Sequence, residues 1–432
     1  MNGHRRWAGS CCYPESFPAM AQVFPFQPYR YSQKAGRLED LLTQPYDKIT
    51  PEMRARYLSL NRHNLVRIIL GERLPSDNED ENVYTKAAGY FDQWIDSGVL
   101  VQEAEPSLFA YFQEFTLPDA PGPLIRKGFI GLGAVEDYSE GVVHRHEHTL
   151  SGPKKDRLEL LRHTRAHFGQ IFMLYPDPAG EIDRILDIVA RAETTSEVID
   201  EYGAIHRLWK IAEPALVARI RQAMASKKLL IADGHHRYET ALAFRNEHPE
   251  LEDARRVMMT FVNMHSPGLR ILATHRLVTR VETGSFLDRA RANCQVIEAG
   301  SLEALRRAWE ERHAERIRIG VVLGSPPGIV LLEAERAEGQ LDVTFLHERI
   351  LGGLLGLDEE SVRRERNIRY IRGIEAAAAE VEQGSAQLAF LLEPTSIDDV
   401  ARVAFSGGVM PQKSTDFYPK LLSGLTIHKL EK

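Results

Sequence analysis

An apolar run that ends in a short polar loop constrains this chain more than any other segment. Leu229-Leu230-Ile231-Ala232 is typical of a buried strand, and Asp233-Gly234-His235-His236-Arg237 follows it directly. From residue 238 to 247 apolar side chains recur at helical spacing. The sequence therefore predicts a strand, a tight loop and a helix, an arrangement that presents unpaired backbone N–H groups to an anion.

The residue types of this loop suit phosphate chemistry. Gly234 lets backbone amides approach a phosphate closely, and Arg237 supplies a forked cationic clamp. His235 and His236 can donate hydrogen bonds, while Asp233 could act as a general base or hold a magnesium ion that arrives with a nucleotide. The alternative is a tight turn whose aspartate caps the helix and whose histidines pack in the core.

A second polar group precedes another predicted helix. His144, His146, Glu147, His148 and Thr149 are followed by Pro153-Lys154-Lys155-Asp156-Arg157. Alternate histidines would share one side of a strand, so a metal array, a solvated loop and a substrate or phosphate contact all remain open. Basic residues in a first helical turn oppose the helix dipole unless an anion sits there. We therefore predict that Lys154, Lys155 and Arg157 face the same pocket as the Asp233 loop.

A third polar group lies near the C-terminus, between Gly407-Gly408 and a final apolar run. It reads Met410-Pro-Gln-Lys413-Ser414-Thr415-Asp-Phe-Tyr-Pro-Lys420. Lys413, Ser414 and Thr415 could contact an anion, and a surface connection between elements is the equally supported alternative.

Length and charge exclude several classes of protein. A chain of 432 residues exceeds the size of a single core, so two domains are expected. A net charge of −7 argues against wrapping nucleic acid, and no apolar stretch is long enough to span a membrane. Three cysteines form neither a disulfide framework nor a zinc pattern, which fits a cytoplasmic protein. The Walker, Rossmann, serine-hydrolase and protein-kinase motifs are absent from the sequence.

Local patterns predict a mixed α/β fold. Residues 109–115 and 128–135 suggest paired strands, residues 65–70 and 171–175 further strands, and residues 153–168 a helix. Residues 257–262 and 270–274 are expected in one sheet. From about residue 286 helices and strands alternate again, which predicts a second domain.

The three polar groups, with Pro45-Tyr46-Asp47, resemble the bacterial and archaeal family known as domain of unknown function 1015. The likeness runs from about residue 21 to residue 425. Its most specific pieces are His146-Glu147-x-Thr149, the segment from Ala232 to Ala241, and Met410 to Thr415 with Phe417 to Lys420.

The Asp233-to-Arg237 box is also similar, more distantly, to the phosphate-contacting box of the ParB and sulfiredoxin-like superfamily, which includes free serine kinases. This resemblance implies Asp233 as catalytic carboxylate and Gly234, His235, His236 and Arg237 as a phosphate cradle. The Pro45-Tyr46-Asp47 loop would correspond to the first box of that superfamily, and large insertions would fill the gap.

Together these observations predict a nucleotide-dependent phosphotransferase for a small hydroxylated metabolite, with free serine or phosphoserine as the leading guess and either direction of transfer open. A nucleotide-binding regulatory protein is the alternative. ATP or ADP with Mg²⁺ is the expected cofactor, and a homo-oligomer is left open.

We expect a terminal extension over 1–20, a ParB/sulfiredoxin-like catalytic domain over 21–285 and an α/β domain over 286–432. The expected catalytic residues are Asp233, His236 and Glu147; the expected phosphate ligands are Gly234, His235, Arg237, Lys154, Lys155, Arg157, Lys413, Ser414 and Thr415; the expected substrate contacts are Tyr46, Asp47, His146, Thr149 and Tyr238.

Overall fold

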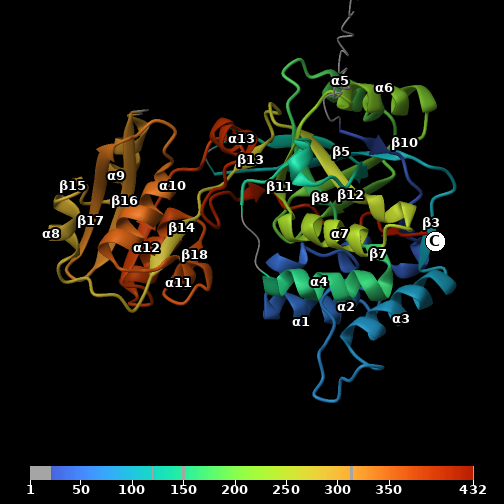
Figure 1. The fold of residues 1–432 in the computed structure, drawn as a ribbon, viewed down its shortest axis with the longest axis horizontal. Coiled ribbons are helices and arrows are strands. Elements are labelled where there is room, and N and C mark those ends of the chain that lie inside the picture. Colours follow the sequence, from blue (N-terminus) through green and yellow to red (C-terminus); the bar gives the residue numbers. More distant parts are fainter. Residues whose placement is uncertain (1–20, 119, 148–150, 312–314, 432) are drawn as a thin grey trace, which may run out of the picture.

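The chain has mixed α and β structure, as predicted. It forms two lobes (Figure 1). The computed structural model describes residues 21–118, 120–147, 151–311 and 315–431. The predicted N-terminal extension lies outside these residues. Within them, no helix combines the length and the apolar character that a membrane span requires.

The larger lobe is built on a mixed sheet that has nine strands among the described residues, in the order β6-β11-β8-β12-β5-β4-β10-β9, with β1 paired to β5. Its strands are β1 (Val23–Phe24), β4 (Leu108–Phe115), β5 (Leu124–Ala134), β6 (Val143–His144), β8 (Ile171–Tyr175), β9 (Ser196–Ile199), β10 (Ile205–Ile211), β11 (Leu229–Asp233) and β12 (Arg256–Asn263). The predicted β4–β5 pairing is confirmed as antiparallel. The predicted strand over residues 229–232 is confirmed as β11, which pairs with β6 and β8.

Helices cover this sheet and stack upon one another. They are α1 (Pro51–Leu60), α2 (Val66–Ile69), α3 (Val83–Asp96), α4 (Ser151–Thr164), α5 (Glu181–Val189), α6 (Pro214–Met224) and α7 (His235–Glu247). Buried side chains of α5, α6 and α7 share one hydrophobic cluster with the sheet. Helix α4 packs on α7 and α3 packs on α4, so α7 lies between the sheet and an outer helical layer (Figure 1).

Two expectations for secondary structure were wrong, and the helix predicted over residues 153–168 forms with different bounds. Residues 65–70 contain helix α2 instead of a strand, because the buried Asn64 side chain accepts a hydrogen bond from the Val66 N–H at 2.9 Å and starts a helical turn. Helix α4 begins at Ser151 and ends at Thr164, before a residue with positive φ at Arg165. Strand β13 (Arg270–Ile271) leaves the larger sheet and pairs with β20 (Phe417–Tyr418).

The smaller lobe holds an antiparallel sheet that has six strands within the described ranges, in the order β15-β17-β16-β19-β14-β18. Its strands are β14 (His275–Val278), β15 (Gln295–Glu298), β16 (Arg316–Gly324), β17 (Pro327–Glu335), β18 (Ile368–Ile371) and β19 (Leu388–Leu391). Its helices are α8 (Phe286–Arg291), α9 (Leu302–Glu310), α10 (Asp342–Phe345), the π-helix η6 (Leu346–Leu354), α11 (Glu359–Arg363), α12 (Ile374–Glu382) and α13 (Ile397–Phe405). Strand β14 precedes residue 286, where the second domain was expected to begin.

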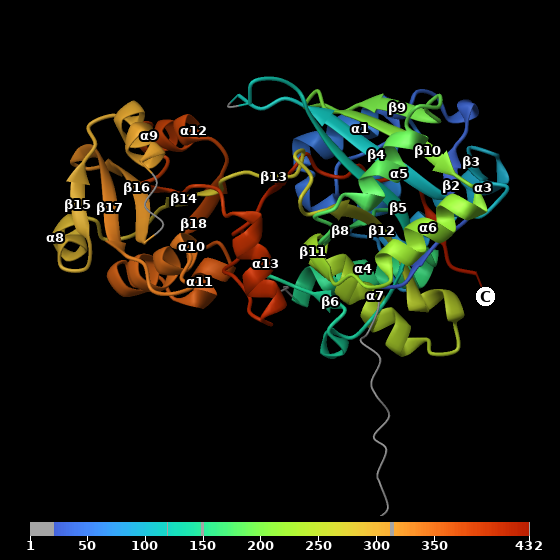
Figure 2. The same cartoon turned by 90° about the horizontal axis from the view of Figure 1, so that it is seen from above.

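After α13 the chain returns to the larger lobe (Figure 2). Strand β21 (His428–Lys429) pairs with β7 (Ala166–His167), and β2 (Tyr29–Tyr31) pairs with β3 (Leu100–Gln102). Leu421, Leu422 and Leu425 are buried in the cluster that also contains Leu230 and Ala232 of β11. This packing brings the third polar group of the sequence to the Asp233 loop.

Candidate functional site

The predicted strand-loop-helix forms as expected at the end of β11. The register of β11 against β8 shifts between Ile231 and Asp233, so Asp233 leaves the regular ladder. Gly234 has φ +94° and caps the N-terminus of α7. A Cβ there would lie 3.0 Å from the guanidinium carbon of Arg237 and would need a strained backbone. The glycine therefore allows both the tight turn and the close approach of Arg237.

Asp233 carries a carboxylate surrounded by cations. Its Oδ2 lies 3.6 Å from the Arg237 guanidinium and 3.8 Å from the Lys420 ammonium. Burial opposes ionisation, but Lys420, Arg237 and Lys48 outweigh burial and hold the pKa of Asp233 well below its usual range. Asp233 is therefore ionised at neutral pH.

Lysines from distant segments gather at this carboxylate. Lys48 ends the 3-10 helix η3 (Tyr46–Lys48), and burial together with repulsion from Lys420 and Lys413 lowers its pKa. The negative charges of Asp233 and Asp47 act to raise the pKa of Lys48. The sequence analysis did not identify Lys48 or Lys420, although Lys48 adjoins Tyr46-Asp47 and Lys420 closes the third polar group.

A second buried carboxylate shares Lys420 and connects the site to the smaller lobe. Asp416 Oδ1 lies 3.1 Å from the Lys420 ammonium. Arg372, which follows β18, donates to Asp416 Oδ1 at 2.8 Å and also pairs with its Oδ2. Burial opposes ionisation of Asp416, but Lys420 and Arg372 lower its pKa to about 2.

Glu147 differs from Asp233 in its electrostatic surroundings. Burial raises the pKa of Glu147, and Lys413 offsets this only in part through its charge and through its backbone N–H, which donates to the carboxylate. The pKa values of two carboxyl groups near one cationic cluster are therefore shifted in opposite directions: that of Glu147 is raised and that of Asp233 is lowered. This is the pattern expected when one carboxyl group exchanges a proton and the other stays ionised.

His236, Tyr46 and Asp47 complete this neighbourhood. Burial lowers the pKa of His236, whereas Asp47 and Glu239 favour its protonated form. Burial and Asp47 raise the pKa of Tyr46 to about 12, while Arg157 and Arg237 act against that rise. The structure thus brings Tyr46, Asp47 and His236 together with the Asp233 loop.

Two expected substrate contacts, His146 and Tyr238, are buried and already hydrogen-bonded to other parts of the protein. Both ring nitrogens of His146 are used: Nδ1–H donates to the Ile231 carbonyl and Nε2 accepts from the Thr415 hydroxyl, each at 2.8 Å. Burial lowers the pKa of His146 to about 4, so the ring is neutral. The Tyr238 hydroxyl exchanges hydrogen bonds with the backbone of Glu136 at 2.7 and 2.9 Å. Both side chains, together with Thr415, have structural contacts.

The basic start of α4 lies only in part at the loop. Arg157 and Arg237 line one small cavity of about 70 Å³, and the Arg157 guanidinium lies 4.3 Å from the centre of the Tyr46 ring. Lys154 instead donates to Glu239 at 2.6 Å, and Lys155 is exposed. Of the three basic residues, Arg157 is therefore the one that shares a cavity with the loop.

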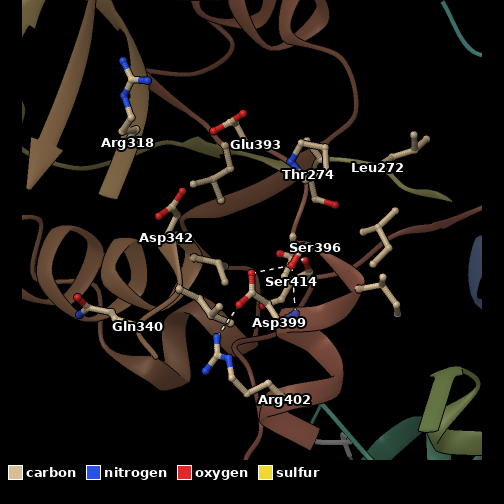
Figure 3. A pocket seen from close by; sticks show the side chains of 18 of the residues that line it. Leu272, Thr274, Arg318, Gln340, Asp342, Glu393, Ser396, Asp399, Arg402 and Ser414 are labelled. Atoms are coloured by element: carbon tan, nitrogen blue, oxygen red, sulfur yellow. Dashed lines mark hydrogen bonds and ion pairs between the residues drawn. The ribbon is translucent and has the colours of Figure 1, made fainter. Parts of the chain in front are cut away.

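Of the remaining predicted residues, His235 lies in the Asp233 loop and Ser414 lies at a different cavity. His235 is buried, its ring lies edge-on to His146 at 4.7 Å, and its Nε2 has no hydrogen-bond partner among the described residues. Ser414 donates to the Pro411 carbonyl and lines a different cavity, most of whose walls come from the smaller lobe (Figure 3). His148 and Thr149 lie outside the described residues. Within the ranges that are described, no group of three or more His, Cys, Asp or Glu side chains could hold a metal ion.

The fold and the site define a mixed α+β protein with a cationic, carboxylate-centred site at the N-terminus of a buried helix. The chain belongs to the family described as "Protein of unknown function (DUF1015)", which matches residues 23–344. No curated protein matches it.

Solved structures that are similar to this chain share little sequence with it. "Free serine kinase in complex with AMP" is 14% identical, with a TM-score of 0.37, and the match covers 67% of this chain and 88% of that one. A conserved hypothetical protein from Pyrococcus furiosus is 14% identical, with a TM-score of 0.35 and coverage of 65% and 89%. SbnI with a C-terminal truncation, from Staphylococcus aureus, is 12% identical, with a TM-score of 0.35 and coverage of 68% and 85%.

Proposed function

We propose that this protein is a nucleotide-dependent phosphotransferase that acts on a small hydroxylated metabolite. The observation that carries the proposal is the ionised, half-buried Asp233 with Lys48, Arg237 and Lys420 around it at the N-terminus of α7. Phosphoryl transfer depends mainly on positioning and on stabilising negative charge. Several cations and a row of helix N–H groups at one carboxylate meet both needs.

The roles follow from the charges. Arg237, Lys48 and Lys420 would hold the phosphate oxygens, and the first-turn N–H groups of α7 would add donors without intrahelical acceptors. Asp233 would orient the acceptor hydroxyl, and Glu147 is the stronger base because its pKa is raised. Glu147 would then accept the hydroxyl proton as the new O–P bond forms and the phosphoanhydride bond of the nucleotide breaks.

Magnesium would enter with the nucleotide. Mg²⁺ takes its oxygen ligands largely from phosphates and water, with one or two carboxylates from the protein. Asp233 and Asp47 both influence the pKa values of Lys48 and Tyr46, and their carboxylates are the oxygens that would coordinate the ion. The resemblance of the Asp233 box to that of free serine kinases makes free serine the first acceptor to test.

Phosphorus NMR tests the proposal directly. Wild-type protein with ATP or ADP, Mg²⁺ and L-serine or another hydroxylated amino acid should give a new phosphomonoester signal. Asp233→Asn should lose that signal, whereas Asp96→Asn, an exposed aspartate on α3, should keep it. Nucleotide binding with no phosphomonoester from any acceptor, in either direction of transfer, would favour the regulatory alternative.

A further inference from the structure

A row of buried polar side chains crosses three neighbouring strands of the larger sheet, β10, β4 and β5 (Figure 2). His206, Gln113 and Arg126 lie directly opposite one another on these strands, so their side chains share one face of the sheet. Each of the three is at most 1% exposed. Among the described residues Arg126 donates only to neutral oxygens, although a buried guanidinium is usually paired with a carboxylate. A satisfied polar row of this kind makes the segments that it joins rigid.

The row holds the backbone of the segment that carries Lys420. Arg126 donates to the Tyr418 carbonyl at 3.2 Å and to the Pro419 carbonyl. Gln113 Nε2 donates to the Lys420 carbonyl at 2.8 Å. Three consecutive carbonyl groups are thus bonded to the sheet that also contains β11, so the backbone of Lys420 is fixed relative to the loop that follows β11.

Asp200 and His206 set the direction in which the Gln113 amide points. Burial lowers the pKa of His206 although Asp200 favours its protonated form, so the ring is neutral. Burial opposes ionisation of Asp200, but the hydrogen bond from His206 outweighs it and lowers the pKa of Asp200, which therefore accepts from Nε2–H at 3.2 Å. Nδ1 is then an acceptor for the Gln113 NH2 group at 3.3 Å, which leaves Gln113 Oε1 to accept from Arg126 Nε at 3.0 Å. The hydrogen bonds run in one direction, from Arg126 to Asp200, and keep the Gln113 N–H groups toward the Lys420 carbonyl.

The side chain of Lys420 extends from this fixed backbone to the carboxylates of the site. Its ammonium lies 3.8 Å from Asp233 Oδ2 and 3.1 Å from Asp416 Oδ1. We propose that Gln113 and Arg126 are positioning residues of the phosphotransfer site, which act through Lys420 by holding its backbone so that the ammonium lies beside Asp233. This positioning role rests on the proposed function, because it uses the phosphate-binding role of Lys420.

A double-mutant cycle on nucleotide affinity tests this role. Gln113→Leu removes the donor to the Lys420 carbonyl and should raise the dissociation constant of ADP with Mg²⁺, measured by calorimetry, roughly tenfold. The same substitution in a Lys420→Met background should change that constant by less than about twofold, because the ammonium through which Gln113 acts is absent. A residue with a merely structural role would weaken binding by the same factor in both backgrounds.

A second variant guards against a folding defect in Gln113→Leu. Arg126→Lys keeps the buried charge and loses the forked hold on the two carbonyls before Lys420. It should raise the ADP dissociation constant by roughly threefold or more in the wild-type background, and again have little effect in Lys420→Met. Circular dichroism and the unfolding midpoint show which variants are folded.

Asn263→Leu is the matched control for the loss of a buried amide. Asn263 of β12 is 2% exposed and donates to the Asp177 carbonyl at 2.8 Å, instead of to the segment that carries Lys420. The control should lower the unfolding midpoint, as Gln113→Leu does, and keep the wild-type affinity for ADP.

The outcomes separate this role from the proposed function. A wild-type protein that binds neither ADP nor ATP refutes the proposed function and this role with it. Where the wild type binds nucleotide, the positioning role alone is overturned if a folded Gln113→Leu or Arg126→Lys protein keeps wild-type affinity. It is also overturned if the loss is equally large in the Lys420→Met background, or if Asn263→Leu weakens ADP binding as much.

Discussion

Lys420→Met tests whether one buried ammonium holds both carboxylates of the site in their ionised form. Lys420 is 8% exposed and lies 3.8 Å from Asp233 and 3.1 Å from Asp416. Methionine keeps most of the apolar stem and removes the charge. Arg237 remains at Asp233 and Arg372 remains at Asp416, so neither carboxylate loses every partner.

The expected loss of folding free energy is about 3 kcal/mol at pH 7. Removing one partner of a buried ion pair typically costs roughly 3–5 kcal/mol, and the remaining arginines place this case at the lower end. The pKa of Asp416 gives a consistent magnitude: a decrease from 3.8 to about 2, at roughly 1.4 kcal/mol per unit, corresponds to about 2.5 kcal/mol. Lys420 is the largest of the attractive contributions to that decrease.

The lowered pKa values of the two carboxyl groups determine how the stability difference should change with pH. Asp233 and Asp416 have lower pKa values in the folded protein than in the unfolded chain, so the stability they contribute is present above about pH 4 and is lost as pH falls toward their folded pKa values. Lys420→Met returns both pKa values toward normal. The difference in stability between wild type and variant should therefore be largest at pH 7 and shrink toward pH 3.

Urea unfolding at a series of pH values measures this difference. Lys429→Met is the matched control, because Lys429 forms a surface pair with Asp92 at 3.1 Å and should change stability by less than about 1 kcal/mol. A Lys420→Met protein as stable as the control variant at pH 7, or a difference that grows as the pH falls, would refute the reasoning.

Three further predictions concern the loop and its support. Arg237→Ala should weaken nucleotide binding in calorimetry by roughly tenfold or more, whereas Asp233→Asn should retain most affinity and lose roughly 10²-fold in turnover. Gly234→Ala should lower the free energy of unfolding by about 1 kcal/mol and raise the nucleotide dissociation constant, because a Cβ at φ +94° is strained and displaces Arg237; equal affinity in both proteins would contradict this. His146→Phe should destabilise the protein by about 1–3 kcal/mol, since it leaves the Ile231 carbonyl and the Thr415 hydroxyl unpaired. His146 stays neutral when folded and is protonated when unfolded, so unfolding experiments should show a smaller loss of stability below about pH 6.5 in the variant than in the wild type, the remainder coming from other buried histidines such as His167 and His275.

The Asp233 loop could be predicted from sequence because its determinants are local. An apolar strand, a glycine and a periodic helix occupy adjacent residues, and the structure reproduces this order in β11 and α7. The hairpin of β4 and β5 was equally readable from two apolar runs around a Pro-Gly turn. The run at residues 65–70 was misread because its apolar composition suits a strand, while the hydrogen bond from the Val66 N–H to the Asn64 side chain, which starts the helical turn, has no periodic signature.

The cations around Asp233 could not be found in the same way. No sequence spacing marks a lysine that will lie at a binding site, because its position depends on which segments the fold brings together. Lys48 reaches the site on a short 3-10 helix, and Lys420 reaches it because the β13–β20 pairing and the burial of Leu421 and Leu422 place the C-terminal segment beneath β11. These are tertiary contacts between residues far apart in sequence. The residue types had pointed to the segment that ends at Lys420, and the family resemblance to the Pro45-Tyr46-Asp47 loop that precedes Lys48, but neither had singled out these two lysines.

The segment from residue 410 to 420 belongs to the site because both lobes hold it. From the larger lobe, the buried Arg126 donates to the Tyr418 carbonyl at 3.2 Å and to the Pro419 carbonyl. From the smaller lobe, Arg276 donates to the Lys413 carbonyl at 3.0 Å, and Arg372 binds Asp416. A segment fixed from two sides keeps its lysines near Asp233 only while the lobes keep their present arrangement. The number of positive charges around Asp233 therefore depends on contacts made by the smaller lobe, which gives that lobe a physical role at a site to which it contributes no lysine.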